Sequence, residues 1–170
     1  MLFDQTLLFY HTGNVYNFTS GEFVSLAGVT GSTASSVINL GNARDLGIGE
    51  GQEIPKIAVV VGTAFTSSSS SMLINVQFQG STDSINWTTY AESGAQSTAS
   101  YAAGNYVLPI DVPRRPSGVA LPLYYRLDVV VTGTGGTPTI STGTLIGGIV
   151  LARDGSADTL GQYPAGYTVA

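Results

Sequence analysis

The stretch Met72-Leu73-Ile74-Asn75-Val76-Gln77-Phe78-Gln79 decides the fold class. Its even-numbered residues are apolar, and three of its four odd-numbered residues are polar amides. A period of two is that of a β-strand with one face buried and the other toward solvent. The stretch 124–132 repeats the pattern, with apolar side chains at every second position: Tyr125, Leu127, Val129 and Val131. Both stretches therefore predict half-buried antiparallel strands.

Further short strands are expected on either side of these two. The run 56–65 is rich in Val and Ala and predicts a buried strand, whereas Ile85, Trp87 and Thr89 continue the alternation after a turn. Additional strands are expected at 36–40, 106–110 and 139–151. Segments rich in Gly, Ser, Thr or Pro predict loops and turns, at 42–55, 66–71, 94–103, 114–118 and 133–138, and the similar segment 17–33 predicts a loop or a short irregular hairpin.

No segment has the 3.6-residue apolar period of a helix. Roughly eight short strands joined by turns are typical of an antiparallel β-sandwich or jelly roll. We therefore expect an all-β, single-domain protein with a jelly-roll body at 17–152. An N-terminal strand or arm at 1–16 and a C-terminal arm at 153–170 flank this body.

The composition indicates a structural or binding protein rather than an enzyme. The 170 residues include one histidine (His11), one lysine (Lys56) and no cysteine, and only 10% are charged, against roughly 25% in an ordinary domain. Enzymes commonly use His, Cys, Lys or paired carboxylates for proton transfer and nucleophilic attack. These groups are scarce and scattered here, so we predict no catalytic residue and no cofactor.

Charge and hydropathy restrict the partners. The net charge of −5 argues against nucleic acid as a partner. No apolar run approaches the 18 or so residues of a membrane span, and Leu7-Leu8-Phe9-Tyr10 is too short, so no membrane partner is expected. The absence of cysteine fits a protein made in a reducing cytoplasm.

The most motif-like stretch is Ser81-Thr82-Asp83-Ser84-Ile85-Asn86-Trp87. It is similar to the Asp-box of carbohydrate-active β-proteins, in which Ser and Asp brace a hairpin turn above a Trp. The spacing is one residue short and the usual glycine is missing. We therefore expect a turn capped by Asp83, with Trp87 filling the core.

None of the other candidate groups has the neighbouring residues that a catalytic or metal site would need. His11 has no neighbouring ligand or acid, so we expect a structural or surface role. The acids Asp45, Glu50 and Glu53 match no known calcium loop and predict a solvated loop. A glycosidase needs two paired carboxylates, for which Asp111 and Asp128 are candidates. Nothing in the sequence indicates that these two residues lie close together. We predict no metal site.

The paired arginines and the apolar residues of the two arms are better candidates for contacts with partners than for catalysis. Arg114 and Arg115 are two of only six cations and stand between prolines, which predicts either a solvated turn or contact with an acidic surface. The two arms carry apolar or aromatic residues that a free tail has no reason to expose. The expected partner contacts are Leu7, Leu8, Phe9, Tyr10, Arg114, Arg115, Tyr163 and Tyr167. A weakly charged β surface also favours a homo-oligomer, either a dimer or a trimer.

Five segments, taken in order, resemble a known family. They are Met1–Phe9, Ser32–Gly41 (Ser-Thr-Ala-Ser-Ser-Val-Ile-Asn-Leu-Gly), Arg44–Glu50, Val76–Asp83 and Pro122–Asp128. Together they resemble the Bbp16-like capsid cement proteins of tailed bacteriophages. The chain departs from the family pattern at Asn39, where Asp is usual, at Gln52, where Pro is common, and in residues 12–30, which resemble an insertion.

The resemblance implies a jelly-roll decoration protein that stabilises contacts between major capsid protein subunits. Such a protein is made in the host cytoplasm and ends on the outer surface of the virion capsid. The alternative is a carbohydrate-binding or receptor-binding β-sandwich module of a phage particle, because fold alone does not decide function. An exposed aromatic platform would favour that alternative. A polysaccharide hydrolase would instead need two carboxylates that meet in a cleft.

Overall fold

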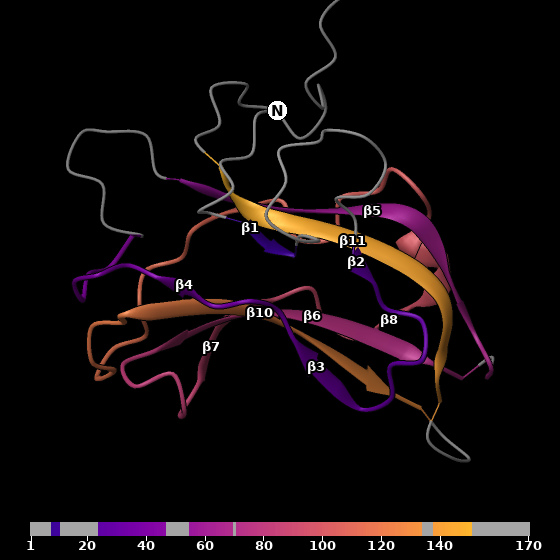
Figure 1. Cartoon of the computed structure of the whole chain (residues 1–170), viewed down its shortest axis with the longest axis horizontal. Coiled ribbons are helices and arrows are strands. Elements are labelled where there is room, and N and C mark those ends of the chain that lie inside the picture. The colour runs from indigo at the N-terminus through magenta and orange to yellow at the C-terminus, as the bar shows by residue number, and fades with distance from the viewer. Residues whose placement is uncertain (1–7, 11–23, 47–54, 70, 134–137, 151–170) are drawn as a thin grey trace, which may run out of the picture.

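Two antiparallel sheets pack face to face in the computed structural model, which describes residues 8–10, 24–46, 55–69, 71–133 and 138–150 (Figure 1). The first sheet has the order β1 (Leu8–Tyr10), β11 (Ile140–Val150), β5 (Lys56–Ser67) and β9 (Ile110–Asp111), and β2 (Val24–Ser25) also pairs with β11. The second has the order β3 (Ser32–Ala34), β10 (Tyr124–Thr132), β6 (Leu73–Ser81) and β7 (Thr88–Glu92). In this second sheet β4 (Ile38–Asn39) also pairs with β10, and β8 (Gln96–Ser97) with β6.

The predicted all-β sandwich is confirmed, and its jelly-roll topology stays a prediction. Strand β10 has the predicted bounds, and β5, β6 and β11 differ from theirs by one or two residues at each end. Residues 8–10 of the predicted N-terminal strand form β1, opposite Gly147 and Gly148 of β11. The arm boundaries and residues 153–170 lie outside the described residues.

The alternating strands place one face of each sheet in a shared core. Ile74, Val76 and Phe78 of β6 are fully buried, as are Leu127 and Val129 opposite them on β10. The first sheet contributes its own alternating set to the same core: Ile57, Val59, Val61, Leu145 and Ile149. Ala58 and Ile146 point to the other face of the first sheet and are buried too, which explains why the run 56–65 reads as apolar rather than alternating.

Two expectations for the segment 94–110 were wrong. The predicted loop 94–103 contains β8 and a 3-10 helix (Thr98–Tyr101), and Tyr101 is fully buried, with its hydroxyl donating to the Ile74 carbonyl at 2.9 Å. The predicted strand 106–110 is reduced to a single bridge between Tyr106 and Val60 and the two residues of β9. Pro109 lacks a backbone N–H and interrupts the ladder there.

The segment 17–33, expected as a loop or a short irregular hairpin, includes β2 and the start of β3, which pair with β11 and β10 rather than with each other. Trp87 was expected in the core but lies half-buried on the solvent side of the second sheet, beside Arg126. A period-two pattern cannot place a residue that precedes its strand, and β7 begins only at Thr88.

Candidate functional site

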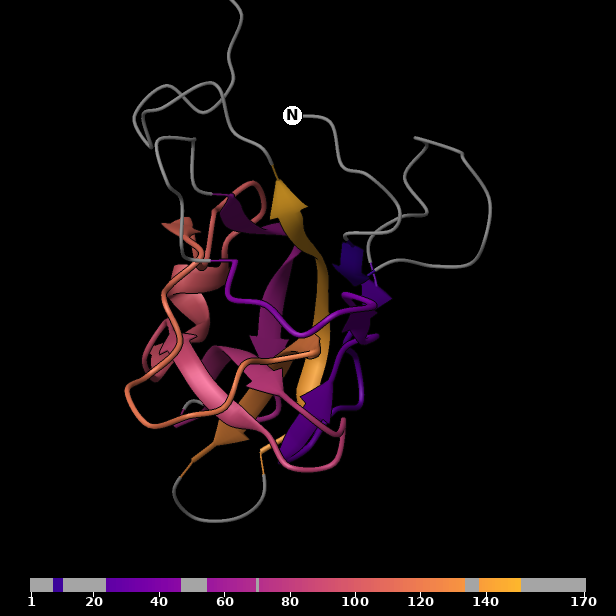
Figure 2. The ribbon, with the colours of Figure 1, turned by 90° about the vertical axis from the view of Figure 1, so that its left-hand side faces the viewer.

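Three segments meet at one end of the sandwich, which faces the viewer in Figure 2. We call this the loop end and define it as residues 35–46, 82–86 and 112–123. Backbone hydrogen bonds join the segments: Leu40 N–H to the Leu123 carbonyl at 2.9 Å, Arg44 N–H to the Pro122 carbonyl at 3.0 Å, and Leu123 N–H to the Ser81 carbonyl at 2.8 Å. The loop end is therefore a connected surface rather than three independent loops.

Most of the large hydrophobic side chains that are exposed among the described residues lie in the loop end. Among these residues four large hydrophobic side chains are exposed, and three of them belong to this end: Val37 (44% exposed), Ile85 (78%) and Leu121 (42%). The fourth, Leu73 (38%), starts β6 at the opposite end. Single exposed hydrophobics are ordinary, but a group on connected segments marks a contact surface.

The turn from β6 to β7 leaves Ile85 exposed while its polar groups bond one another. The Asp83 carboxylate accepts hydrogen bonds from the Ile85 N–H (2.9 Å) and from the Asn86 N–H (2.8 Å) and amide (2.7 Å). The Ser81 hydroxyl accepts from the Ser84 N–H at 2.9 Å. These bonds, the Asn86 backbone first, lower the pKa of Asp83 below its ordinary value of 3.8. The predicted Asp83 cap is confirmed.

The two predicted contact arginines have different roles in the loop end. The Arg115 N–H donates to the Asp45 carboxylate at 3.0 Å, and the Arg115 guanidinium donates to the Val119 carbonyl. Arg115 therefore holds the 112–123 segment against the 35–46 segment. Arg114 is exposed and has no hydrogen bond or ion pair with any other described residue. Among the two, Arg114 is the more open to an external partner.

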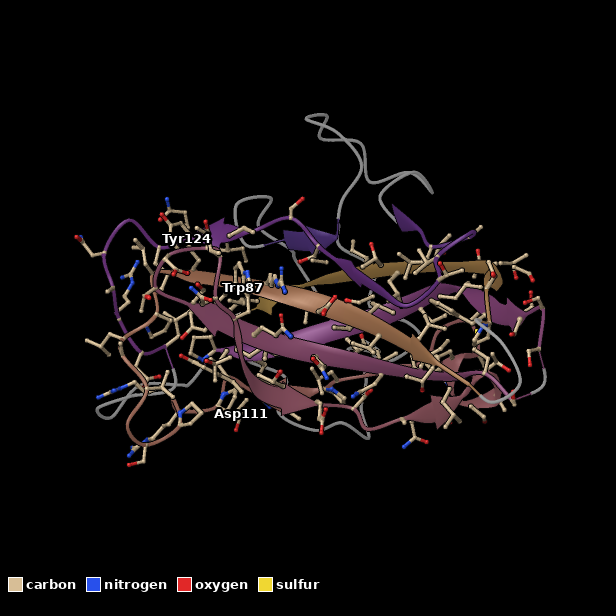
Figure 3. The ribbon with its side chains drawn as sticks, turned by 90° about the horizontal axis from the view of Figure 1, so that it is seen from below. Trp87, Asp111 and Tyr124 are labelled. Carbon is tan, nitrogen blue, oxygen red and sulfur yellow. The ribbon has the colours of Figure 1, made fainter. Side chains whose placement is uncertain are left out.

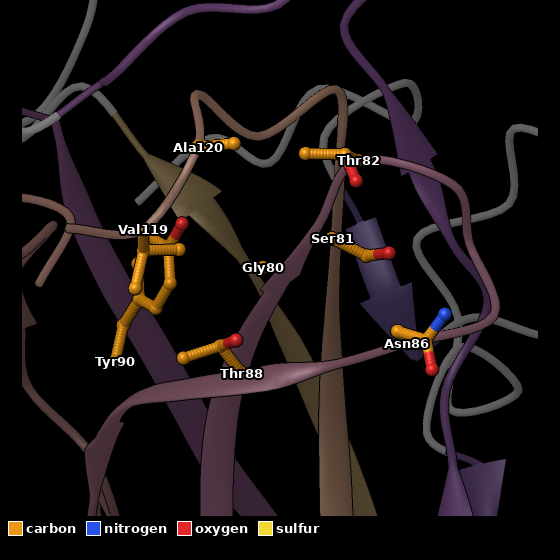
Figure 4. A pocket seen from close by; sticks show the side chains of 8 residues that line it. All are labelled: Gly80, Ser81, Thr82, Asn86, Thr88, Tyr90, Val119 and Ala120. Carbon is orange, nitrogen blue, oxygen red and sulfur yellow. The ribbon is translucent and has the colours of Figure 1, made fainter.

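A small pocket of about 160 Å³ lies beneath the loop end (Figure 4). It is lined by Gly80, Ser81, Thr82, Asn86, Thr88, Tyr90, Val119 and Ala120. The Tyr90 hydroxyl is buried without a hydrogen-bond partner among the described residues, and burial raises its pKa. Ligand pockets usually measure about 300–1,000 Å³. This cavity, with no carboxylate or imidazole in its lining, is a packing seam rather than an active site.

The solvent side of the second sheet carries a connected polar network. Glu92 accepts from the amides of Asn75 (2.8 Å) and Gln77 (3.3 Å). Gln77 in turn accepts from the amide of Gln79 (2.9 Å), and Gln79 accepts from Nε of Arg126 (2.8 Å). The network ends at Trp87, where the Arg126 guanidinium carbon lies 4.2 Å from the ring centroid.

Figure 3 shows this face directly, with Trp87 and Tyr124 labelled on it. Tyr124 is half-buried and shares its face of β10 with Arg126, because side chains two apart on a strand point the same way. Aromatic rings on a solvated sheet face are the feature that the carbohydrate-binding alternative requires. Sequence reasoning missed this pair because it assigned Trp87 to the core and did not consider Tyr124.

The other candidate residues do not come together. Asp111 belongs to β9 of the first sheet, where its carboxylate lies 3.8 Å from the Lys56 ammonium. Asp128 lies on the solvent side of the second sheet and accepts from the Ser32 hydroxyl at 2.8 and 2.9 Å. The two acids are on different sheets and face no common cleft. Across the described ranges, no three His, Cys, Asp or Glu residues form a group that could hold a metal ion.

Several predicted residues lie beyond the described ranges. They are Leu7, His11, Glu50, Glu53, Tyr163 and Tyr167. Leu8, Phe9 and Tyr10 form β1, and the contacts predicted for their side chains stay a prediction.

Comparisons with known proteins found no match that indicates a function. Within the described part of the chain, no helix is long and apolar enough to cross a membrane. No protein-family model matches the sequence, and no curated protein shows significant similarity to it.

Proposed function

We propose that this chain is a capsid decoration protein, of the kind that the cement-protein resemblance implies. It binds the outer surface of an icosahedral phage head and stabilises contacts between major capsid protein subunits. The observation that carries the proposal is the loop end, where Val37, Ile85 and Leu121 expose apolar surface at the same end of the sandwich as the exposed cation Arg114.

The loop end exposes apolar side chains and carries arginines, two features of protein interfaces. Protein interfaces combine an apolar centre with aromatic residues, Met or Arg, and are poor in other charges. The turn around Asp83 is built so that its polar groups bond one another and its most apolar residue, Ile85, points outward.

The size of the loop end predicts weak binding by one copy. Full burial of an apolar side chain contributes about 1.5–3 kcal/mol, so three partly exposed side chains contribute a few kcal/mol. Association costs an estimated 4–15 kcal/mol in lost freedom of motion. We therefore propose that the protein acts as a homo-oligomer, because several loop ends on one repetitive shell bind far more tightly than one.

A pair of matched variants tests the proposal. Leu121→Ser removes apolar surface from the loop end, and Leu73→Ser removes a side chain of nearly equal exposure from the opposite end. Each variant is sedimented with shells assembled from the major capsid protein of the same phage. We expect Leu121→Ser to weaken shell binding at least tenfold and Leu73→Ser to bind like the wild type. Equal binding by both variants would contradict a loop-end interface.

A further inference from the structure

We propose that the solvent side of the second sheet binds an oligosaccharide, at a site separate from the loop-end contacts Val37, Leu121 and Arg114. The site is a row of three side chains across neighbouring strands, which we call the aromatic row: Trp87, Ser81 and Tyr124. Tyr124 lies opposite Ser81 in the β10–β6 pairing, and Trp87 directly precedes Thr88, which lies opposite Gly80 in the β6–β7 pairing.

The two rings of the aromatic row stand on either side of β6. Strands lie roughly 4.8 Å apart, so the backbones that carry the two rings are separated by about 9–10 Å. Between them lies Ser81, a small buried residue whose hydroxyl is engaged by the turn. Two half-buried rings at this spacing suit a short, extended ligand with flat apolar faces better than a single small molecule.

Open hydrogen-bond donors surround the aromatic row. A guanidinium has five N–H donors, and Arg126 uses only its Nε, toward Gln79, within the described residues. The indole N–H of Trp87 and the hydroxyl of Tyr124 also have no hydrogen-bond partner in that part of the chain. The nearby acids are already engaged, Glu92 by Asn75 and Gln77, and Asp128 by Ser32. A complementary ligand must therefore supply acceptor oxygens.

The site is held in place before any ligand arrives. Gln79 is only 7% exposed, and it fixes Arg126 while Trp87 contacts the same guanidinium. Side chains that are already held in their bound positions lose less conformational entropy on binding. Cross-strand polar pairs also stabilise sheets, which accounts for Gln77 and Glu92. Stabilisation of the sheet by polar pairs does not explain why two aromatic rings with open donors lie on the solvent side.

Other classes of ligand fit the face less well. Glu92, Asp128 and the net charge of −5 repel a nucleic acid backbone. A protein partner needs a contiguous apolar centre, which the loop end offers and this face lacks. An oligosaccharide offers C–H faces that stack on aromatic rings and hydroxyl or carboxylate oxygens that accept from Arg126. Neutral and uronic-acid sugars share this chemistry.

Intrinsic fluorescence reports on the site directly, because Trp87 is the only tryptophan of the chain. The full chain is first screened on an array of neutral and uronic-acid oligosaccharides. The best-bound members of each class are then titrated while the emission of Trp87 is recorded. We expect at least one class to bind and to shift or quench the emission, and the stronger class identifies the acceptor that Arg126 prefers.

Variants then locate the binding surface. Tyr124→Ala and Arg126→Gln should each weaken binding at least tenfold, whereas Trp87→Phe keeps a ring and should retain part of the affinity. Leu121→Ser is the control that should bind sugar like the wild type, and thermal unfolding checks that each variant is folded. Folded Tyr124→Ala and Arg126→Gln variants with unchanged affinity would overturn the proposal, as would an array on which nothing binds.

The capsid proposal and the saccharide proposal can be contradicted independently of each other. Tyr124→Ala should leave shell sedimentation unchanged, and Leu121→Ser should leave sugar binding unchanged. Loss of shell binding with Tyr124→Ala alone would assign the aromatic row to the capsid contact and contradict the saccharide site.

Discussion

Arg126 and Trp87 form a cation–π contact across the second sheet, with the guanidinium carbon 4.2 Å from the ring centroid. Arg126 lies on β10 and Trp87 directly before β7, so the contact spans β6, whose Gln79 bonds the same guanidinium at 2.8 Å. The pair thus ties the β6–β7 turn to the middle of the sheet.

The coupling between these two side chains should be measurable. Cation–π contacts at exposed sites contribute about 0.5–1 kcal/mol. A double-mutant cycle of Arg126→Gln and Trp87→Leu, followed by urea unfolding, should give a coupling energy of about that size. Fully additive effects of the two substitutions would show that the contact adds nothing to stability.

The turn at Asp83 should make stability depend on pH in the acidic range. Because the folded pKa is lowered, the carboxylate stabilises the fold above its unfolded pKa and loses this effect as the pH falls. Wild type should therefore melt at a higher temperature than Asp83→Asn at pH 7. The difference should shrink steadily below about pH 4. A difference that stays constant down to pH 2 would contradict the carboxylate's role.

The buried hydroxyl of Tyr101 should contribute to stability chiefly through its hydrogen bond to the Ile74 carbonyl. It donates to the Ile74 carbonyl at 2.9 Å in the core, and Tyr101→Phe leaves that carbonyl short of a partner. Loss of such a buried bond costs about 1–2 kcal/mol. Chemical denaturation of Tyr101→Phe should show this loss with an unchanged m-value, whereas an unchanged midpoint would mean that the bond contributes nothing net.

Gly143 should not tolerate a side chain. Its φ of +149° is unfavourable for L-residues, and a Cβ there would lie 2.7 Å from the Phe65 ring. Overpacking of a core costs about 1–3 kcal/mol, so Gly143→Ala should lower the free energy of unfolding by at least that amount. Ala102→Gly, at an exposed position, is a comparison that should change stability by less. Wild-type stability of Gly143→Ala would refute the close contact.

The sequence predicts this fold well where burial alternates with residue number. Strands β6 and β10 follow directly from their period of two, because one face of each meets the core. Tyr101 escaped prediction because it projects into the core from a short 3-10 helix within a polar segment. Neither a period nor a composition shift marks such a residue.

The candidate surfaces were harder to predict than the strands. The Asp83 turn could be foreseen because its hydrogen bonds are local in sequence. The loop end combines residues as far apart as Val37 and Leu121, and the aromatic row combines Trp87 with Tyr124. Pairs of this kind follow only from strand order and register, which a single sequence does not encode locally.

Electron microscopy of the virion, with the gene for this chain deleted and then restored, tests the capsid proposal most directly. We predict density on the outer surface of the restored particles that is missing from the deleted ones. The sandwich should fit this density with segments 82–86 and 112–123 against the shell and the aromatic row toward solvent. Identical particles in both preparations, or a sandwich whose loop end points away from the shell, would contradict the account.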